Sequence, residues 1–266
     1  MRLADAPPAV RYPAVRYVEA SRFGVAETSA VAEETPIAFR FGGVDYAVMM
    51  ATPADIEDFT TGFAVTEGIA GGMEDIRAVE VQAGDECLMV DVTLSPARFR
   101  TFLADHRVRS LRGHTSCGVC GLESTHLLAH GNRKVAHSRP PSTEAIHQAL
   151  ASLHDLQPLA CETRAAHAAA WCDGNGKIIH LREDIGRHNA LDKLIGAGLR
   201  ASIDTRAGFC LITSRCSFEM VQKAVAAGMS TLVAISAPTG LAVRTARQAG
   251  LTLLASARND GHTLFA

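Results

Sequence analysis

The sequence brings two thiols together in the run Cys117-Gly-Val-Cys120, which Gly121 follows directly. Two cysteines at this spacing can reach each other or a shared atom, and the glycines let the backbone turn without steric cost. The nearby Arg112 and His114 favour the thiolate, which is the nucleophilic form of a thiol. The run therefore predicts sulfur chemistry, either disulfide exchange or a persulfide carried on one cysteine.

A structural zinc site is the alternative interpretation of the same cysteines. His114, His126 and His130 are available to complete it, and the last two have the i, i+4 spacing of one helix face. No second Cys-x-x-Cys pair occurs in the sequence. The spacing alone therefore favours thiol chemistry over a metal site, and we predict no metal ligands.

A second group of reactive side chains lies in residues 182–193, where a predicted strand ends and a helix begins. Asp184, Arg187 and His188 are concentrated at this junction. A carboxylate, a guanidinium and an imidazole together can orient a ligand or transfer a proton near neutral pH. A solvated helix start is the simpler interpretation. His167, which opens a short apolar run, is either a core histidine or part of the same group.

Three predicted strands end in segments that carry hydroxyl groups. The segments are residues 213–215, 236–239 and 256–258, which include Arg215 and Arg258. Ligands of open parallel sheets bind beyond such ends, and helix N-termini that follow there favour phosphate. We therefore predict a site for a phosphorylated or nucleotide ligand, with ordinary loop polarity as the alternative. The sequence contains neither a Walker A motif nor G-x-G-x-x-G, which argues against a P-loop NTPase or a Rossmann dehydrogenase.

The elements that must position these residues alternate regularly in the last third of the chain. Strands are predicted at 209–213, 231–235 and 251–254, with helices at 217–227 and 239–249 between them. This alternation predicts a parallel sheet with right-handed crossovers.

Hairpins are predicted over residues 37–50, 77–94 and 165–181. Further helices are predicted to begin at Thr52-Pro53, with Thr52 as N-cap, and over 95–105, 142–153 and 189–199. We interpret residues 1–26 as a loose leader and 27–266 as a single domain. Its lobes are expected at about 27–105 and 142–266, joined by an irregular loop at 106–141 that contains the cysteine pair.

Composition limits the class of protein. The 266 residues are 47% hydrophobic and 20% charged, with a net charge of -2, as in a globular protein without a general affinity for nucleic acid. No apolar run approaches a membrane span, and the N-terminus lacks the apolar segment of a signal peptide. Seven cysteines without a framework spacing predict a reducing, cytoplasmic compartment.

Several longer motifs make the sequence similar to the FdhD family, the accessory sulfurtransferases of formate dehydrogenase. The resemblance extends over most of the chain from about residue 31. The motifs that carry it are, in chain order, Val31-Ala-Glu-Glu-Thr-Pro36, Cys117-Gly-Val-Cys-Gly121, His167-Ala-Ala-Ala-Trp171, Glu183-Asp-Ile-Gly-Arg-His-Asn-Ala-Leu-Asp-Lys193, Ser214-Arg-Cys-Ser-Phe-Glu-Met-Val-Gln-Lys223 and Ser236-Ala-Pro-Thr239. Their order makes the match far more specific than the cysteine pair alone.

This resemblance implies an α/β fold of the cytidine-deaminase-like type, with a mixed sheet, flanking helices and two lobes, in a homodimer. It implies a sulfurtransferase that accepts a persulfide from a cysteine desulfurase. The sulfur would pass to the molybdenum cofactor, bis-molybdopterin guanine dinucleotide, for use by formate dehydrogenase. The cofactor would be a bound substrate, and we expect no permanent cofactor and no membrane or nucleic-acid partner.

The resemblance also implies roles for individual residues. Cys117 would carry the persulfide, with Cys120 as its partner. The family's cofactor-binding stretch corresponds to Ser256, Ala257, Arg258, Asn259, Asp260 and Gly261. We add as candidates for holding or orienting the cofactor Arg215, His167, Asp184 and His188.

Two segments depart from the family pattern. A Thr-Gly-Gly-like turn is replaced by Thr163-Arg-Ala-Ala166, and residues 256–261 vary from a more basic segment led by an aromatic residue. The alternative function is a non-catalytic chaperone that binds the molybdenum cofactor, with cysteines that are structural or bind zinc. A zinc deaminase is a third interpretation, weakened because no H-x-E or C-x-E element is paired with Pro-Cys-x-x-Cys.

Overall fold

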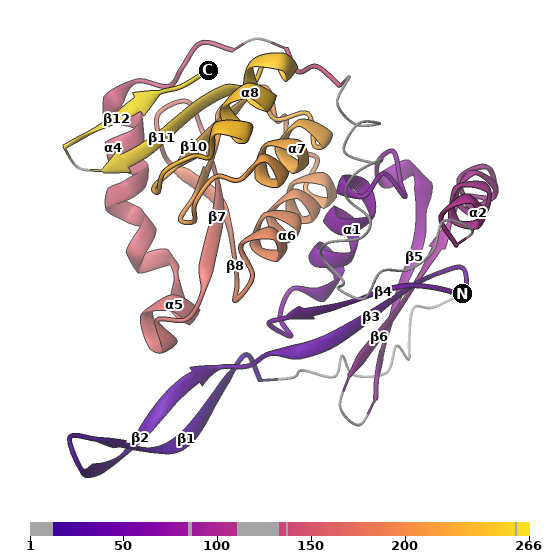
Figure 1. The fold of residues 1–266 in the computed structure, drawn as a ribbon, viewed down its shortest axis with the longest axis horizontal. Coiled ribbons are helices and arrows are strands. Elements are labelled where there is room, and N and C mark those ends of the chain that lie inside the picture. Colours follow the sequence, from indigo (N-terminus) through magenta and orange to yellow (C-terminus); the bar gives the residue numbers. More distant parts are fainter. Residues whose placement is uncertain (1–12, 85–86, 111–132, 137, 259) are drawn as a thin grey trace, which may run out of the picture.

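The structure is a computed structural model that describes residues 13–84, 87–110, 133–136, 138–258 and 260–266. It contains a larger sheet of six strands, a smaller sheet of four strands and a separate two-stranded ribbon (Figure 1). The mixed α/β architecture predicted from the sequence is confirmed. No helix in these ranges combines the length and the apolar composition needed to cross a membrane.

The larger sheet has the strand order β12-β11-β10-β9-β7-β8. Its central strands β9, β10 and β11 are parallel, as the alternation of elements predicts. β7 and β8 form the predicted antiparallel hairpin, whereas the antiparallel strand β12 was not predicted. The strand bounds are β7 (His167–Cys172), β8 (Ile178–Asp184), β9 (Phe209–Ile212), β10 (Thr231–Ala234), β11 (Thr252–Arg258) and β12 (Gly261–Leu264).

Helices cover both faces of this sheet because successive residues of its strands point to opposite sides. Ala169 and Trp171 join a core beneath α6 (Arg187–Arg200), α7 (Phe218–Ala226) and α8 (Gly240–Ala249). The alternate residues of β7 join a core beneath α4 (Thr143–Leu153) on the other face. A short helical turn, η2 (His154–Leu156), and α5 (Pro158–Thr163) follow α4.

Capping residues set the helix ends as predicted. The Ser142 hydroxyl accepts a hydrogen bond from the Ala145 amide at 3.2 Å, and the Thr239 hydroxyl accepts one from the Ala242 amide at 3.2 Å. Gly250 ends α8 at a φ of 74°, in the left-handed region that glycine enters without a penalty.

The smaller sheet has the order β4-β3-β6-β5. Both of its antiparallel pairs match predicted hairpins, and β3 and β6 pair in parallel between them. Its core is rich in phenylalanine, with the rings of Phe39 and Phe63 stacked at a centroid distance of 4.6 Å. The bounds are β3 (Thr35–Phe41), β4 (Val44–Ala51), α1 (Ile56–Thr66), η1 (Met73–Asp75), β5 (Ile76–Ala83), β6 (Leu88–Leu94) and α2 (Pro96–Ser110).

Helices α1 and α6 lie side by side and join the two lobes (Figure 1). The helix predicted to start at Thr52 in fact begins at Ile56, so the prediction of Thr52 as N-cap is wrong. Thr52 is fully buried instead, and its backbone amide donates to Asp184 at 3.0 Å. A local capping signal was overridden here by contacts with a distant segment.

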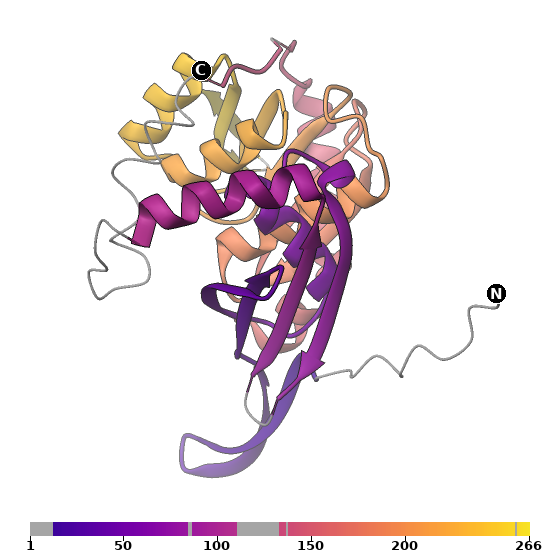
Figure 2. The same cartoon turned by 90° about the vertical axis from the view of Figure 1, so that its right-hand side faces the viewer.

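The prediction that residues 1–26 form a loose leader is wrong from Val15 onward. β1 (Val15–Arg22) and β2 (Val25–Ala32) pair as an antiparallel ribbon that projects from the body of the molecule (Figures 1 and 2). Phe23 and Gly24 have φ values of 52° and 82°, which is the backbone of a tight hairpin turn. The prolines at 7, 8 and 13 suggested irregular chain, but they precede this ribbon.

Candidate functional site

The carboxyl edge of the larger sheet brings several predicted site residues together. His167, the first residue of β7, pairs with Asp184, the last residue of β8. The Thr213 side chain, at the end of β9, accepts a hydrogen bond from the Ala168 amide at 2.9 Å. This edge therefore collects residues 167, 184 and 213–215 from three separate parts of the sequence.

A β-bulge in β11 sets the orientation of the predicted cofactor-binding stretch. The pairing with β12 shifts register between Ala255 and Arg258, and Ser256 adopts a left-handed φ of 54°. Ala255 is buried in the core under α8, whereas Ala257 is buried in the core under α4. The extra residue thus turns Ala257 and Arg258 toward the α4 side of the sheet.

An open cleft of about 490 Å³ lies at this place, between the end of α4 and the carboxyl edge of the sheet. Its volume is within the range of small-molecule sites. Apolar side chains form most of its walls, with a few polar groups among them. The lining residues are Leu150, Leu153, His154, Gln157, Ala160, Ala166, Thr213, Ile235, Ala257 and Arg258.

The sequence predicted Thr213, Ala257 and Arg258 as parts of a ligand site, but it gave no indication that His154 and Gln157 line the same cleft. These two residues follow α4 in a segment without a recognisable motif. Only the packing of α4 on the sheet brings them opposite β11.

Arg187 and Arg215 place positive charge near His167 at the same edge of the sheet. Burial lowers the pKa of His167, and the charges of Arg187 and Arg215 lower it further, so the imidazole is neutral near pH 7. His188 Nε2 lies 2.9 Å from Glu219 Oε2, and this contact holds the pKa of Glu219 below its ordinary value. The arginines and the neutral imidazole can bind an anion or accept a proton there.

Asp184 is fully buried and faces the junction between the lobes. Lys193 Nζ lies 2.7 Å from its Oδ2, and the Asn189 amide group donates to its Oδ1 at 3.0 Å. The Gly186 amide donates to the same Oδ1 at 2.8 Å. With both oxygens occupied by protein groups, Asp184 holds the turn that precedes α6 and does not present a free oxygen to a ligand.

Three predicted site residues, Cys117, Cys120 and Asn259, lie outside the residues that the structure describes. Asp260 is exposed, and Gly261 pairs with Arg258 across the turn between β11 and β12. Within the described ranges, no cluster of three histidine, cysteine or acidic side chains could hold a metal ion.

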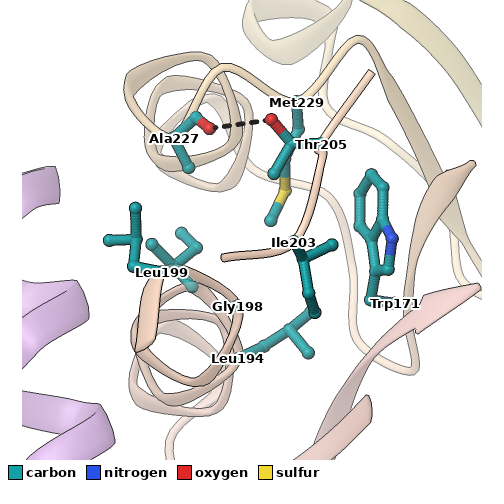
Figure 3. Close-up of a pocket in the computed structure, with 9 residues that line it drawn as sticks. Trp171, Leu194, Gly198, Leu199, Ile203, Thr205, Ala227 and Met229 are labelled. Atoms are coloured by element: carbon teal, nitrogen blue, oxygen red, sulfur yellow. Dashed lines mark hydrogen bonds between the residues drawn. The ribbon is translucent and has the colours of Figure 1, made fainter. Parts of the chain in front are cut away.

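A second cavity, enclosed by apolar side chains beneath α6, has a volume of only about 20 Å³ (Figure 3). Trp171, Leu199 and Met229 are among the residues that line it. The Thr205 hydroxyl at its edge donates to the backbone carbonyl oxygens of Ala227 at 3.4 Å and Gly228 at 3.3 Å. This space has room for about one water molecule and is a packing gap of the core.

Known proteins that are similar in sequence to this chain bear the name of the family that the motifs indicate. The sulfur carrier protein FdhD of Xanthomonas euvesicatoria pv. vesicatoria is 46% identical over 253 residues, which cover 94% of this chain and 89% of that protein. The sulfur carrier protein FdhD of Bordetella bronchiseptica is 44% identical over 239 residues, 90% of this chain and 86% of that protein.

The fold is similar to the crystal structure of a putative formate dehydrogenase accessory protein from Desulfotalea psychrophila. The TM-score is 0.72 at 22% sequence identity, over 94% of this chain and 95% of that chain. A family model described as the FdhD/NarQ family matches residues 32–266. The chain belongs to the FdhD/NarQ family.

Proposed function

We propose that this protein is a sulfur carrier that serves a formate dehydrogenase. Cys117 receives sulfur as a persulfide from a cysteine desulfurase, with Cys120 as its partner, and passes the sulfur to the molybdenum cofactor. The cofactor, bis-molybdopterin guanine dinucleotide, is a substrate held during the transfer. Family membership and the names of the similar proteins support sulfur transfer, and the motif order supports the choice of residues.

The open cleft at the carboxyl edge is the observation that carries the proposal. It is lined by Ala257 and Arg258, which belong to the stretch that the family resemblance assigns to cofactor binding. A guanine dinucleotide has phosphates that an arginine can bind and a base that apolar walls can cover. Arg215 and His167 lie on the same edge of the sheet and are the next candidates for contact with the ligand.

The loading of Cys117 with sulfur conserves atoms and electrons. The Cys117 thiolate attacks the outer sulfur of the desulfurase persulfide, and a new sulfur–sulfur bond forms. The bond between the two sulfurs of the donor breaks, and its electron pair leaves with the donor cysteine as thiolate. No external oxidant is needed, because the outer sulfur already has the oxidation state that the carrier requires.

We propose, as the family resemblance implies, that the chain acts in the cytoplasm as a homodimer with a cytidine-deaminase-like fold. Its partners are the cysteine desulfurase and the catalytic subunit of formate dehydrogenase.

Intact mass spectrometry tests the carrier role directly. The full chain is incubated with a cysteine desulfurase and free cysteine, alongside Cys117→Ala and Cys120→Ala. We expect a gain of at least one sulfur atom that reductant reverses and that Cys117→Ala greatly reduces. If wild type gains no sulfur but still binds the guanine dinucleotide, the protein is a cofactor-binding chaperone instead. Stoichiometric zinc in that protein would assign its cysteines to a structural site.

A further inference from the structure

Two arginines at the carboxyl edge of the larger sheet have no counter-ion in the described part of the chain. Arg187 is the first residue of α6, and Arg215 lies in the loop between β9 and α7. The Nε atom of Arg187 is buried and has no hydrogen-bond partner. By contrast, the guanidinium groups of Arg182, Arg200 and Arg206 are each paired with an aspartate. Two buried or edge positions therefore carry charge that the fold itself does not use.

The first turns of α6 and α7 meet beside these arginines. His188 and Glu219 are each the second residue of their helix, and His188 Nε2 lies 2.9 Å from Glu219 Oε2. Gly186 has no side chain to cap α6, and the Ser217 hydroxyl donates to Glu219 at 3.2 Å instead of capping α7. Amides without a side-chain acceptor at two adjacent helix N-termini attract anions. The charge of Arg187 opposes the dipole of α6, and an anion between them would relieve that repulsion.

His167 lies on the same face of the sheet as α6 and α7. It alternates with Ala169 and Trp171, which pack in the core beneath these helices, so its side chain points to that face. The charges of Arg187 and Arg215 both act on its imidazole, which places the two guanidinium groups near it. The three side chains thus converge on one place at the sheet edge.

The acidic groups at this place already have partners. Lys193 Nζ lies 2.7 Å from Asp184 Oδ2, and Glu219 is held by His188. Neither carboxylate lies within ion-pair distance of either arginine. The guanidinium groups therefore remain available to an anion from outside the chain.

The open cleft lies on the other face of the same sheet edge. Ala257, which lines the cleft, packs in the core beneath α4. Arg258 also lines the cleft, whereas Arg187, Arg215 and His167 do not. The sheet therefore separates the cleft from the group beside α6 and α7.

We infer that Arg187, Arg215 and His167, with the N-termini of α6 and α7, form a second anion site, which binds a phosphate or diphosphate group. The arginines donate charge-assisted hydrogen bonds to its oxygens, and the helix amides supply further donors. The proposed function supplies such a group in the diphosphate of the guanine dinucleotide, and this source of the ligand rests on that function. Free inorganic phosphate or pyrophosphate is the other source of the same chemistry.

Isothermal titration of the full chain with inorganic pyrophosphate tests the second anion site. We expect the wild type to bind, and Arg187→Gln and Arg215→Gln each to weaken binding about tenfold. Arg187→Lys keeps the charge and should recover part of the loss. Arg206→Ala, which changes an arginine that is paired with aspartate, should bind as the wild type does. Neither Arg187 nor Arg215 forms an ion pair that the fold needs, so both variants should fold, and thermal unfolding checks this.

An NMR titration of His167 gives a second readout that a purely structural role of the arginines would not change. Bound pyrophosphate should raise the pKa of this imidazole through its negative charge. The rise should be much smaller in Arg187→Gln and in Arg215→Gln at the same pyrophosphate concentration, because less anion is bound. Competition with GDP identifies the source of the ligand. If GDP displaces pyrophosphate, the nucleotide diphosphate occupies the site, and if it binds without displacing it, the site serves free phosphate.

Two results would overturn the inference. In the first, the wild type binds GDP but not pyrophosphate, which leaves the proposed function intact. In the second, Arg258→Ala abolishes pyrophosphate binding while Arg187→Gln and Arg215→Gln retain it, which places the anion in the cleft. Pyrophosphate binding that depends on Arg187 and Arg215, in a protein that does not bind GDP, would support the second anion site and count against the proposed cofactor.

Discussion

Gly62 of α1 and Gly196 of α6 lie at a point where the backbones of the two helices touch. A Cβ added to Gly62 would lie 1.8 Å from the backbone oxygen of Asp192, and one added to Gly196 would lie 1.8 Å from that of Asp58. Each distance is far below van der Waals contact. The two lobes can therefore approach this closely only with glycine at both positions.

Gly196→Ala is expected to destabilise the protein by about 3 kcal/mol or more, because the helices must separate to admit the methyl group. Urea unfolding followed by circular dichroism measures the effect. Gly198→Ala is the matched control on the same helix, since its nearest new contact would be the Ile203 side chain at 3.8 Å. We expect Gly198→Ala to be neutral or mildly stabilising. Equal losses for the two variants would contradict the backbone contact.

Lys193→Met should destabilise the protein by about 3–5 kcal/mol, because it leaves the fully buried Asp184 carboxylate without its charged partner. Asp184→Asn combined with Lys193→Met removes both charges and should recover part of the loss. The unfolding midpoint in urea measures both variants. As a comparison, Arg206→Ala breaks the exposed pair with Asp204 and should leave the midpoint unchanged. An equally small effect of Lys193→Met would contradict the stabilising role of the buried pair.

The stability of the protein should fall in mild acid partly through His167. Its pKa is lowered from the ordinary 6.5 in the folded state, so the unfolded chain binds the proton more readily. The stabilisation is complete above about pH 6.5 and is lost as the pH falls through the native pKa. His167→Gln should flatten this part of the pH–stability profile. An NMR titration of the imidazole checks the direction, and Arg187→Ala or Arg215→Ala should raise its midpoint. A wild-type midpoint at or above 6.5 would be incompatible with the structure.

Arg258→Ala should weaken binding of a guanine dinucleotide or of GDP about tenfold, because the cleft loses its arginine. Isothermal titration at two salt concentrations measures the loss, and the salt dependence of wild-type binding should decrease in the variant. Arg206→Ala removes an arginine away from the cleft and should bind as wild type does. Unchanged affinity of Arg258→Ala would place the nucleotide elsewhere.

Local patterns in the sequence were sufficient for much of the larger lobe. The parallel strands β9 to β11, the caps at Ser142 and Thr239 and the glycine after α8 follow from side-chain alternation and from hydrogen bonds within a few residues. The same motifs also identified the family. These features depend on neighbours in the chain, so the chain order alone specifies them.

Contacts between segments far apart in the sequence decided the features that local patterns did not predict. Thr52 looked like a helix cap, but it became a buried partner of Asp184 because that carboxylate needs a donor from the other lobe. The bulge at Ser256 reversed the faces of the residues after it, and the packing of α4 placed His154 at the cleft. Each of these outcomes depends on the satisfaction of a buried polar group or on the filling of space between segments far apart in sequence. No short window of residues contains that information.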